Sequence, residues 1–380
     1  MNLLLINYEY PPLGGGAGNA TMFLSRALHR LGHPTAVLTS AWGEQRGICD
    51  DHGVAVHRLP VSRREANRAS AGEMFGFVRA ALAAAPEVAR RHRAEAVIVF
   101  FTLPCGPVAL RLHRRLGLPY LVSLRGGDVP GLVPEIAWQH RLLTPLRRRI
   151  LRAATAIVAN DAGLADLSRR ADPFPVEVVH NGVDTDFFRP AASSRPGSKP
   201  TEILFVGRLH RQKNLLFFLE QLARLHAAEP GAWQFTVVGD GEERRTLELA
   251  AETLGVGSIT SWLGWQKDKQ DLVRRYQQAD LVINPSLYEG MPNVVLEAMA
   301  CGRPVVASDI PGNNTLVRSG ETGLLFPLGD GAALRRALAT LRHEPVAARR
   351  LGENARRRME AEFSWAHVAQ SYLELLRAGI

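Results

Sequence analysis

The chain has 380 residues, 46% of them hydrophobic and 22% charged, a composition typical of a soluble globular protein too long for one ordinary core. Its longest apolar stretch, residues 96–110, is too short for a membrane span and contains two prolines. The start lacks the basic region of a secretory signal, and the three cysteines are widely spaced. These features predict two domains, a cytoplasmic location, reduced thiols and no metal site.

The excess of positive charge belongs to the first half of the chain. Residues 1–190 carry 23 arginines and no lysine against 16 acids, whereas residues 191–380 carry 23 basic residues against 21 acids. One interpretation is a solvated arginine-rich surface. The other is an anionic partner, such as a lipid phosphate or a membrane surface. Basic and aromatic residues do not interleave, so a nucleic-acid partner is not expected.

In chain order, the first half alternates between apolar strands and helical patterns. A strand over 2–8 is followed by a glycine-rich loop over 11–18 and a helical pattern that ends at Gly32. The next strand covers 35–40, and further β-rich apolar runs follow, most of them separated by helical patterns. Continuous apolar strands that alternate with helices predict a parallel sheet covered on both faces.

A segment rich in Pro, Ser and Gly over 189–202 reads as a linker, and the strand–helix alternation restarts at 203. The predicted fold class is therefore α/β, with two doubly wound Rossmann-like domains that face each other across a cleft. Ligands of such folds bind beyond the carboxyl ends of the strands.

The loop Gly207–Asn214, GRLHRQKN, directly follows an apolar strand. A glycine at a strand end lets a ligand approach the backbone closely. Arg208 and Lys213 could then converge on a phosphate, helped by the start of the following helix. The alternative is a basic loop without a ligand. A Gly-Asp-Gly turn at 239–241 is expected at the same sheet edge, although alone it is only a turn.

The segment EGMPNVVLE, residues 289–297, carries an acid at each end. Pro292 suits the first position of a helix that runs from Asn293 to about residue 300. Glu289 would then precede the helix and Glu297 would lie inside it. Free N–H groups at the helix start, near Gly290–Val294, can receive anions or sugar oxygens. The alternatives are a loop acid and a solvent-facing helix residue.

Taken together, these motifs resemble the retaining glycosyltransferases of family 4, which have the GT-B fold. The resemblance rests on GRLHRQKN, VVGDG, the glutamate pair of EGMPNVVLE and the segment AMACGRPVVASDIPGNNTLV, and it is strongest over 203–330. It implies an acceptor-side domain over 1–188, the linker 189–202, a donor-binding domain over 203–362, and a last helix over 363–380 that joins the first domain.

The resemblance also implies the roles of the residues in the second half. A nucleotide-sugar donor, expected to be a UDP- or GDP-sugar, would place its diphosphate on Arg208 and Lys213, its ribose on Glu297 and its sugar on Glu289. The other donor-binding residues expected there are Gly207, Gly239, Gly264, Gly290, Met291, Pro292 and Asn293.

The first half fits the family less closely. The loop with Gly15 and Gly16 would meet the acceptor and close over the donor phosphates, and its glycine spacing does not fit a dinucleotide-binding fingerprint. Many relatives carry a histidine where this chain has Arg125 and Asp128, which puts the usual histidine role in doubt. Asp128 could polarise the acceptor hydroxyl and Arg125 could contact phosphate. The alternative is a turn built on Gly-Gly-Asp.

The predicted reaction is transfer of a hexose or acetylhexosamine, with retention, to a glycan, lipid-linked or small-molecule acceptor in cell-surface polysaccharide or glycoconjugate biosynthesis. No cofactor is expected. The DTD sequence at 184–186 resembles a metal-binding motif of another fold, but its place before two phenylalanines favours a structural use. A sugar-nucleotide epimerase, a phosphorylase and a non-catalytic sugar-nucleotide-binding protein remain alternatives. A dehydrogenase is disfavoured.

The domain expected to bind the acceptor contains three basic clusters, at 90–93, 111–115 and 146–152. The last cluster lies in an apolar and basic helical pattern interrupted by Pro145. One interpretation is a surface helix that packs through its Leu and Ile residues. The other is a peripheral contact with anionic lipid at the inner membrane face.

Overall fold

The computed structural model describes residues 1–61, 63–65, 69–131, 137–191, 200–266 and 268–378. The chain divides into two compact units. Unit 1 contains Met1–Gly182 and Trp365–Ile380, and unit 2 contains Val183–Ser364. The predicted linker 189–202 lies within the second unit's range, and its residues 192–199 fall outside the described residues.

Unit 1 contains an eight-stranded sheet with the order β3-β4-β2-β1-β5-β6-β7-β8. All neighbours are parallel except β3, which pairs antiparallel with β4. Its strands are β1 Leu3–Ile6, β2 Thr35–Ser40, β3 Gly47–Asp51, β4 Val54–Leu59, β5 Ala96–Phe100, β6 Tyr120–Leu124, β7 Ala156–Ala159 and β8 Glu177–Val178. Strands β1, β2, β5 and β6 are buried along their whole length, as their continuous apolar sequences predict.

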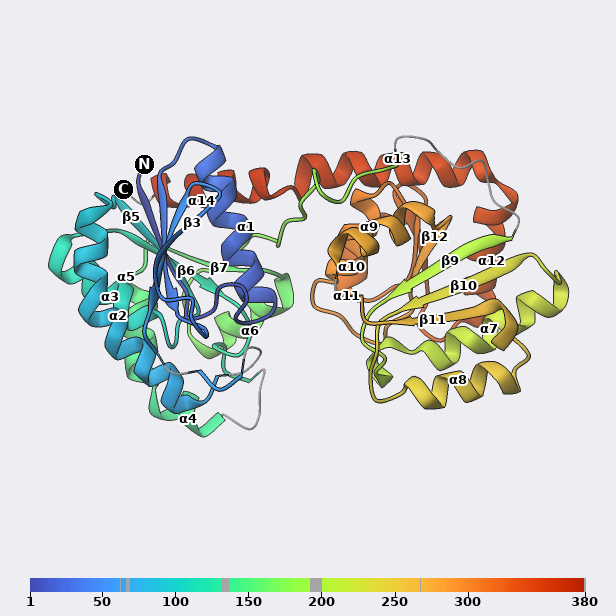
Figure 1. Cartoon of the computed structure of the whole chain (residues 1–380), viewed down its shortest axis with the longest axis horizontal. Coiled ribbons are helices and arrows are strands. Elements are labelled where there is room, and N and C mark those ends of the chain that lie inside the picture. Colours follow the sequence, from blue (N-terminus) through green and yellow to red (C-terminus); the bar gives the residue numbers. More distant parts are fainter. Residues whose placement is uncertain (62, 66–68, 132–136, 192–199, 267, 379–380) are drawn as a thin grey trace. The chain divides into compact units, whose positions relative to one another are not determined.

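Helices cover both faces of this sheet (Figure 1). Within the described residues they are α1 Gly16–Arg30, α2 Ala71–Arg91, α3 Gly106–Leu116, α4 Ala137–Leu142, α5 Thr144–Ala153, α6 Ala162–Ala171 and α14 Trp365–Ala378. Helices α2, α3 and α5 enclose one core cluster, and α1 and α14 enclose the other. Helix α14 packs directly on α1, where the rings of Phe23 and Trp365 stack with centroids 5.7 Å apart.

Unit 2 contains a six-stranded parallel sheet with the order β11-β10-β9-β12-β13-β14. Its strands are β9 Thr201–Val206, β10 Trp233–Val238, β11 Thr260–Gly264, β12 Leu281–Asn284, β13 Val305–Ser308 and β14 Gly323–Phe326. The strand order reverses between β9 and β12, which makes this pair the topological switch point of a doubly wound fold. In unit 1 the corresponding switch point lies between β1 and β5.

The helices of unit 2 also lie on both faces of its sheet (Figure 1). They are α7 Leu215–Ala228, α8 Arg244–Thr253, α9 Lys269–Gln278, α10 Asn293–Ala300, α11 Pro311–Leu316, α12 Gly331–His343 and α13 Pro345–Glu362, with short 3-10 turns η2 Arg211–Lys213 and η3 Gly257–Ile259. Helix α10 has the predicted bounds. Pro292 is its N-cap residue, one position before the predicted one, because its backbone is extended.

Candidate functional site

The loops after β9 and β12 hold the residues with the most specific chemistry in unit 2. They leave the sheet on either side of its switch point, where ligands of doubly wound folds bind. The two loops are joined by hydrogen bonds. The backbone N–H of Leu287 donates to the carbonyl of Gln212 at 2.8 Å, and the Gln212 side-chain amide donates to the carbonyl of Tyr288 at 2.7 Å. These two hydrogen bonds hold the loops next to each other, and the side chains of both loops therefore lie close together.

Lys213 and Glu289 form the ion pair at the centre of this edge. The Lys213 ammonium donates to Oε1 of Glu289, and the Ser286 hydroxyl lies 2.7 Å from the same oxygen. The Glu289 side chain is only 8% exposed, so the pair is held in a poorly solvated position. Oε2 of Glu289 has no partner among the described residues. That oxygen can accept a hydrogen bond from a ligand hydroxyl.

Ser286 belongs to a polar network that sequence reasoning did not find. Its hydroxyl lies 3.0 Å from Oδ1 of Asn284, at the end of β12. The side-chain amide of Asn284 in turn donates to Oδ1 of Asn313 in α11 at 2.7 Å. All three side chains are buried. The available signal was the position of Ser286, three residues before Glu289 in a loop that follows a strand.

Arg208 is exposed and makes no ion pair within the described part of the chain. It extends from the same loop as Lys213, immediately after Gly207. Since Lys213 is already neutralised by Glu289, the uncompensated positive charge of this loop belongs to Arg208 and to Arg211, which is also exposed. The sequence prediction placed both cations together on a phosphate, and the structure brings both to one loop while pairing one of them with an acid.

The predicted glycines Gly207, Gly239 and Gly264 lie at or just after the ends of β9, β10 and β11. A Cβ on Gly239 would approach the carbonyl oxygen of Gly207 to 1.9 Å. Gly264 receives the Gly239 backbone N–H at 2.9 Å through its carbonyl oxygen. Side chains are therefore excluded at Gly239 by the neighbouring backbone itself, which is a structural reason for a glycine there in addition to ligand approach.

Helix α10 begins beside the Lys213–Glu289 ion pair. The backbone N–H groups of its first residues have no carbonyl partner within the helix. Its N-cap, Pro292, makes no side-chain hydrogen bond to the helix, and the first turn contains no acid. Gly290 and Asn293 are exposed and Met291 is half-buried, whereas Pro292 is buried. The positive end of the helix is thus free to interact with a negatively charged or hydroxyl-bearing ligand.

Glu297 lies inside α10 and points toward α9. The fully buried Tyr276 hydroxyl donates to its Oε2 at 2.9 Å. Burial raises the pKa of the Glu297 carboxyl to about 7, despite the opposing effect of the tyrosine hydrogen bond. Glu297 is therefore not the fully solvent-facing helix residue of the alternative interpretation.

In unit 1, Gly15 is the N-cap of α1 and Gly16 is its first residue. The cap has no side-chain hydrogen bond, and a Cβ at either position would meet no atom within 4 Å. The loop therefore leaves open space at the start of a 15-residue helix. Gly14 is different: it has a φ of +83° and packs against the buried Glu9 side chain.

Asp128 is fully engaged by backbone groups of unit 1. Its Oδ2 accepts the Thr102 N–H at 2.7 Å, and its Oδ1 accepts those of Arg125 and Gly126 at 3.0 and 3.1 Å. The residue is 3% exposed, and burial raises the pKa of its carboxyl. These contacts favour the turn interpretation, because the carboxylate ties the loop after β6 to the end of β5. A role toward the acceptor hydroxyl stays a prediction.

Arg125 connects three parts of unit 1. Its guanidinium donates to Oδ1 of Asn181 at 2.6 Å and to the Tyr372 hydroxyl of α14 at 3.2 Å, and it lies over the Phe100 ring. A guanidinium used in this way holds the end of β6 to the last helix. The predicted contact with phosphate stays a prediction.

The DTD sequence forms a turn. Oδ1 of Asp184 accepts the backbone N–H groups of Asp186 and Phe187 at 3.2 and 3.0 Å. Within the described residues, no group of three or more His, Cys, Asp or Glu side chains is arranged to hold a metal ion.

Comparisons with known proteins show which family this chain belongs to. The model of the family "Glycosyl transferases group 1" matches residues 200–344, and the model "Glycosyl transferase 4-like domain" matches residues 15–182. Together they cover most of both units, and the first includes every donor-binding residue predicted in the second half of the chain. The chain belongs to the group 1 glycosyltransferases of family 4, with the GT-B fold.

Individual relatives extend over the same regions. An alpha-maltose-1-phosphate synthase of Mycobacterium tuberculosis is 28% identical over 99% of this chain and 99% of its own length. The lipopolysaccharide core biosynthesis glycosyltransferase LpsE of Rhizobium meliloti is 30% identical over 61% of this chain and 67% of its own length. Anabaena HepE, solved in complex with UDP, shares the fold with a TM-score of 0.72 and 21% identity, covering 100% of both chains.

Proposed function

We propose that this protein is a retaining glycosyltransferase that moves a hexose or acetylhexosamine from a UDP- or GDP-sugar to a glycan, lipid-linked or small-molecule acceptor, in the biosynthesis of cell-surface polysaccharide or glycoconjugates. The observation that carries the proposal is the Lys213–Glu289–Ser286 cluster beside the uncapped start of α10, at the switch point of unit 2. LpsE is a glycosyltransferase of lipopolysaccharide core biosynthesis and HepE was solved in complex with UDP, which supports the acceptor and donor classes.

In this proposal the donor diphosphate lies against Arg208 and Lys213. Negative charge grows on the diphosphate as it leaves, and cations fixed in a poorly solvated site stabilise that charge without having to reorganise. Lys213 is held in place by Glu289, so it is oriented before the donor arrives. The N–H groups at the start of α10, near Gly290 and Asn293, receive phosphate or sugar oxygens.

Glu289 holds the transferred sugar, and Glu297 receives the ribose hydroxyls. Oε2 of Glu289 is the oxygen available to the sugar, since Oε1 is shared by Lys213 and Ser286. A glycosidase that retains configuration uses a second carboxylate about 5 Å away. The sequence shows no second acid beside Glu289 in its loop. We therefore favour attack on the face from which the diphosphate leaves, with that diphosphate accepting the acceptor proton.

The experiment that tests this function is incubation of the purified chain with a panel of UDP-, GDP- and ADP-sugars, with and without acceptors. Released nucleotide and the anomeric configuration of the product are measured. Acceptor-dependent release with retention supports the proposal. Isomerised donor without transfer would indicate an epimerase, and binding without turnover of any donor would indicate a non-catalytic protein. Activity in excess chelator tests the expectation that no metal takes part.

We further propose that unit 1 contacts an anionic membrane through the α4–α5 surface, defined as Trp138, Leu142, Leu143 and Leu146 with Arg141 and Arg149. Trp138 and Leu142 are 65% and 71% exposed, and both arginines are exposed. Ile150 and Leu151 of the basic cluster are buried in the core, as expected for a surface helix that packs through its Leu and Ile residues, whereas Leu146 is exposed. Exposed apolar side chains flanked by arginines are the composition expected at a lipid headgroup boundary.

No described helix is long and apolar enough to cross a bilayer, so contact through this surface would be peripheral. The test is sedimentation with phosphatidylcholine vesicles, with and without phosphatidylglycerol. Binding should require the anionic lipid and should be lost in the double variant Trp138→Ser, Leu142→Ser. Leu249→Ser, which removes an equally exposed leucine from unit 2, is the matched control. Binding that ignores the anionic lipid would contradict the proposal.

A further inference from the structure

Unit 2 contains a cavity of about 1030 Å³ at the opposite edge of its sheet from the candidate donor site. Thr201, Leu281 and Pro304 line it, and these residues lie at or just before the starts of β9, β12 and β13. The donor-site loops follow the other ends of the same strands. Since β9 has six residues, the two edges are roughly 20 Å apart. The cavity is therefore a separate place in the fold.

The lining of the cavity is strongly basic. Its basic side chains are Arg303, Arg342, His343, Arg349, Arg356 and Arg357, against the acids Asp280 and Glu353. Some of these cations already form ion pairs and hydrogen bonds within unit 2. Arg342 pairs with Glu229 at 3.1 Å and donates to Thr201, and Arg356 pairs with Glu360 and donates to three backbone carbonyls. Arg342 and Arg356 account for only part of the positive charge of the cavity lining.

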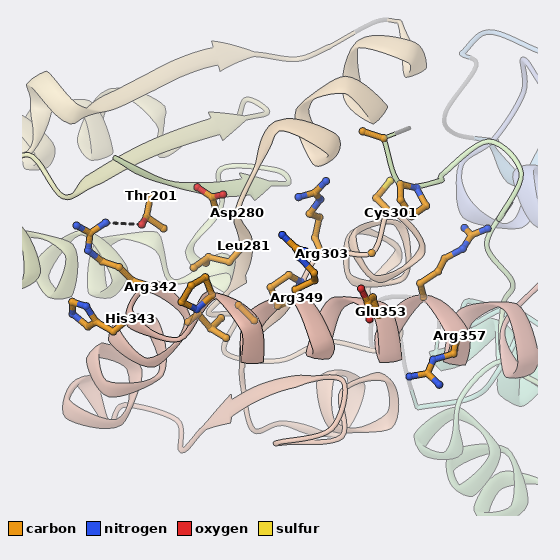
Figure 2. Close-up of a pocket in the computed structure, with 18 residues that line it drawn as sticks. Thr201, Asp280, Leu281, Cys301, Arg303, Arg342, His343, Arg349, Glu353 and Arg357 are labelled. Carbon is orange, nitrogen blue, oxygen red and sulfur yellow. Dashed lines mark hydrogen bonds between the residues drawn. The ribbon is translucent and has the colours of Figure 1, made fainter. Parts of the chain in front are cut away.

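Arg357 also lines the cavity without an ion pair among the described residues and donates to Oδ1 of Asn354. Arg303 and Arg349 are the other two lining arginines that form no ion pair within the described part of the chain. Figure 2 shows them entering the cavity from two elements, the segment before β13 and helix α13. Arg303 donates through Nη1 to the Ala279 carbonyl at 3.0 Å, and its Nε is buried without an acceptor within the described part of the chain. Arg349 is exposed and forms no ion pair with any described residue.

The neighbouring acids offset the positive charge of the lining only in part. Asp280 carries a negative charge that acts on Arg303, and its Oδ2 also accepts the Glu202 backbone N–H at 2.8 Å. Pro345 and Ala348, in the first turn of the 18-residue helix α13, also line the cavity. The N-cap residue of that helix is the acid Glu344, which offsets the positive end of the helix and leaves the arginines as the source of positive charge.

We propose that this cavity is a second anion site that binds a phosphorylated small metabolite, with the phosphate on Arg303 and Arg349 and the remainder against Leu281, Pro304 and Leu341. Paired guanidinium groups suit phosphate oxygens because each presents several donors in one plane. The apolar part of the lining and the size of the cavity suit a ligand larger than a free ion. The site does not depend on the proposed transfer reaction.

Calorimetric titration of the full chain with inorganic pyrophosphate, glucose 6-phosphate and AMP tests the site, with glucose as the uncharged control. The phosphorylated probes should bind and glucose should not. Tight binding of pyrophosphate alone identifies the phosphate as the recognised group, and tighter binding of glucose 6-phosphate or AMP identifies the larger class. Arg349→Gln should weaken binding about tenfold, through loss of one charge-assisted contact.

Two variants make the result specific. Arg350→Gln is the matched control, since Arg350 is an exposed neighbour on α13 that does not line the cavity, and it should bind as the unaltered chain does. Arg208→Gln should leave binding at this site intact, and hydrogen exchange should show protection at 301–304 and 345–349. The proposal is overturned if no probe binds at millimolar concentration, if Arg349→Gln and Arg303→Gln both bind normally, or if Arg208→Gln abolishes binding.

Discussion

Glu289 and Asp128 are both acids in loops at carboxyl ends of parallel strands, one in each unit, yet their surroundings differ. Glu289 is held by two side chains, Lys213 and Ser286, and keeps one oxygen without a described partner. Asp128 uses both oxygens on three backbone N–H groups. An acid positioned by side chains remains available to a ligand, whereas an acid saturated by backbone groups shapes a loop. This difference suggests which of the two acts on substrate.

The most severe test of this contrast is Glu289→Gln. We expect turnover to fall about 100-fold, because the sugar loses a charged acceptor and Lys213 loses its partner. Donor affinity measured by calorimetry should change much less. Glu220→Gln, an exposed acid of α7, is the matched control. Normal turnover of the Glu289 variant would remove this residue from the site.

Arg208→Gln tests whether Arg208, one of two exposed arginines in the loop after β9, binds the donor. Affinity for the nucleotide-sugar should fall about 30-fold, since a charge-assisted contact to phosphate is lost. The loss should be smaller at high salt because of screening. Arg211→Gln, an exposed arginine four positions before the start of α7, should leave affinity unchanged. Equal losses in both variants would indicate a general effect of charge.

Glu297 provides a pH-dependent test. With a pKa of about 7, its carboxyl is mostly protonated below pH 7 and accepts ribose hydroxyls well only when ionised. Donor affinity should therefore rise with pH, and be about tenfold weaker at about pH 6 than at about pH 8. Glu297→Gln should bind weakly at both values and lose this dependence. A profile unchanged by the substitution would assign the pH effect to another group.

Asp128→Asn should have the smallest effect on turnover if the residue only shapes its loop. The amide retains one acceptor oxygen, so the free energy of unfolding should fall by about 1–2 kcal/mol, seen as a lower Tm by calorimetry. Turnover per folded molecule should change less than about threefold. A loss comparable with that of Glu289→Gln would instead restore the predicted role of Asp128 toward the acceptor hydroxyl.

The sequence predicted unit 2 well because its signals are local. Continuous apolar strands, the basic loop at Arg208 and the bounds of α10 can all be read from neighbouring residues. The structure added contacts between distant residues, such as Tyr276 with Glu297 and Asn284 with Asn313. Spacing cannot reveal these pairs, since they depend on how helices and loops pack. For the same reason the antiparallel edge strand β3, which is exposed and lacks an apolar run, was not predicted.

The return of the chain to unit 1 has a consequence for how the protein is made. Unit 2 is one continuous stretch, Val183–Ser364, but one core of unit 1 includes Trp365, Tyr372 and Leu376 of α14. Domains commonly fold in the order in which a ribosome produces them. Here the second unit is fully synthesised before the first. The face of α1 that carries Leu24 and Leu28 stays uncovered until α14 has been translated. A prematurely terminated chain would leave that face without its cover, a ready target for chaperones and proteases.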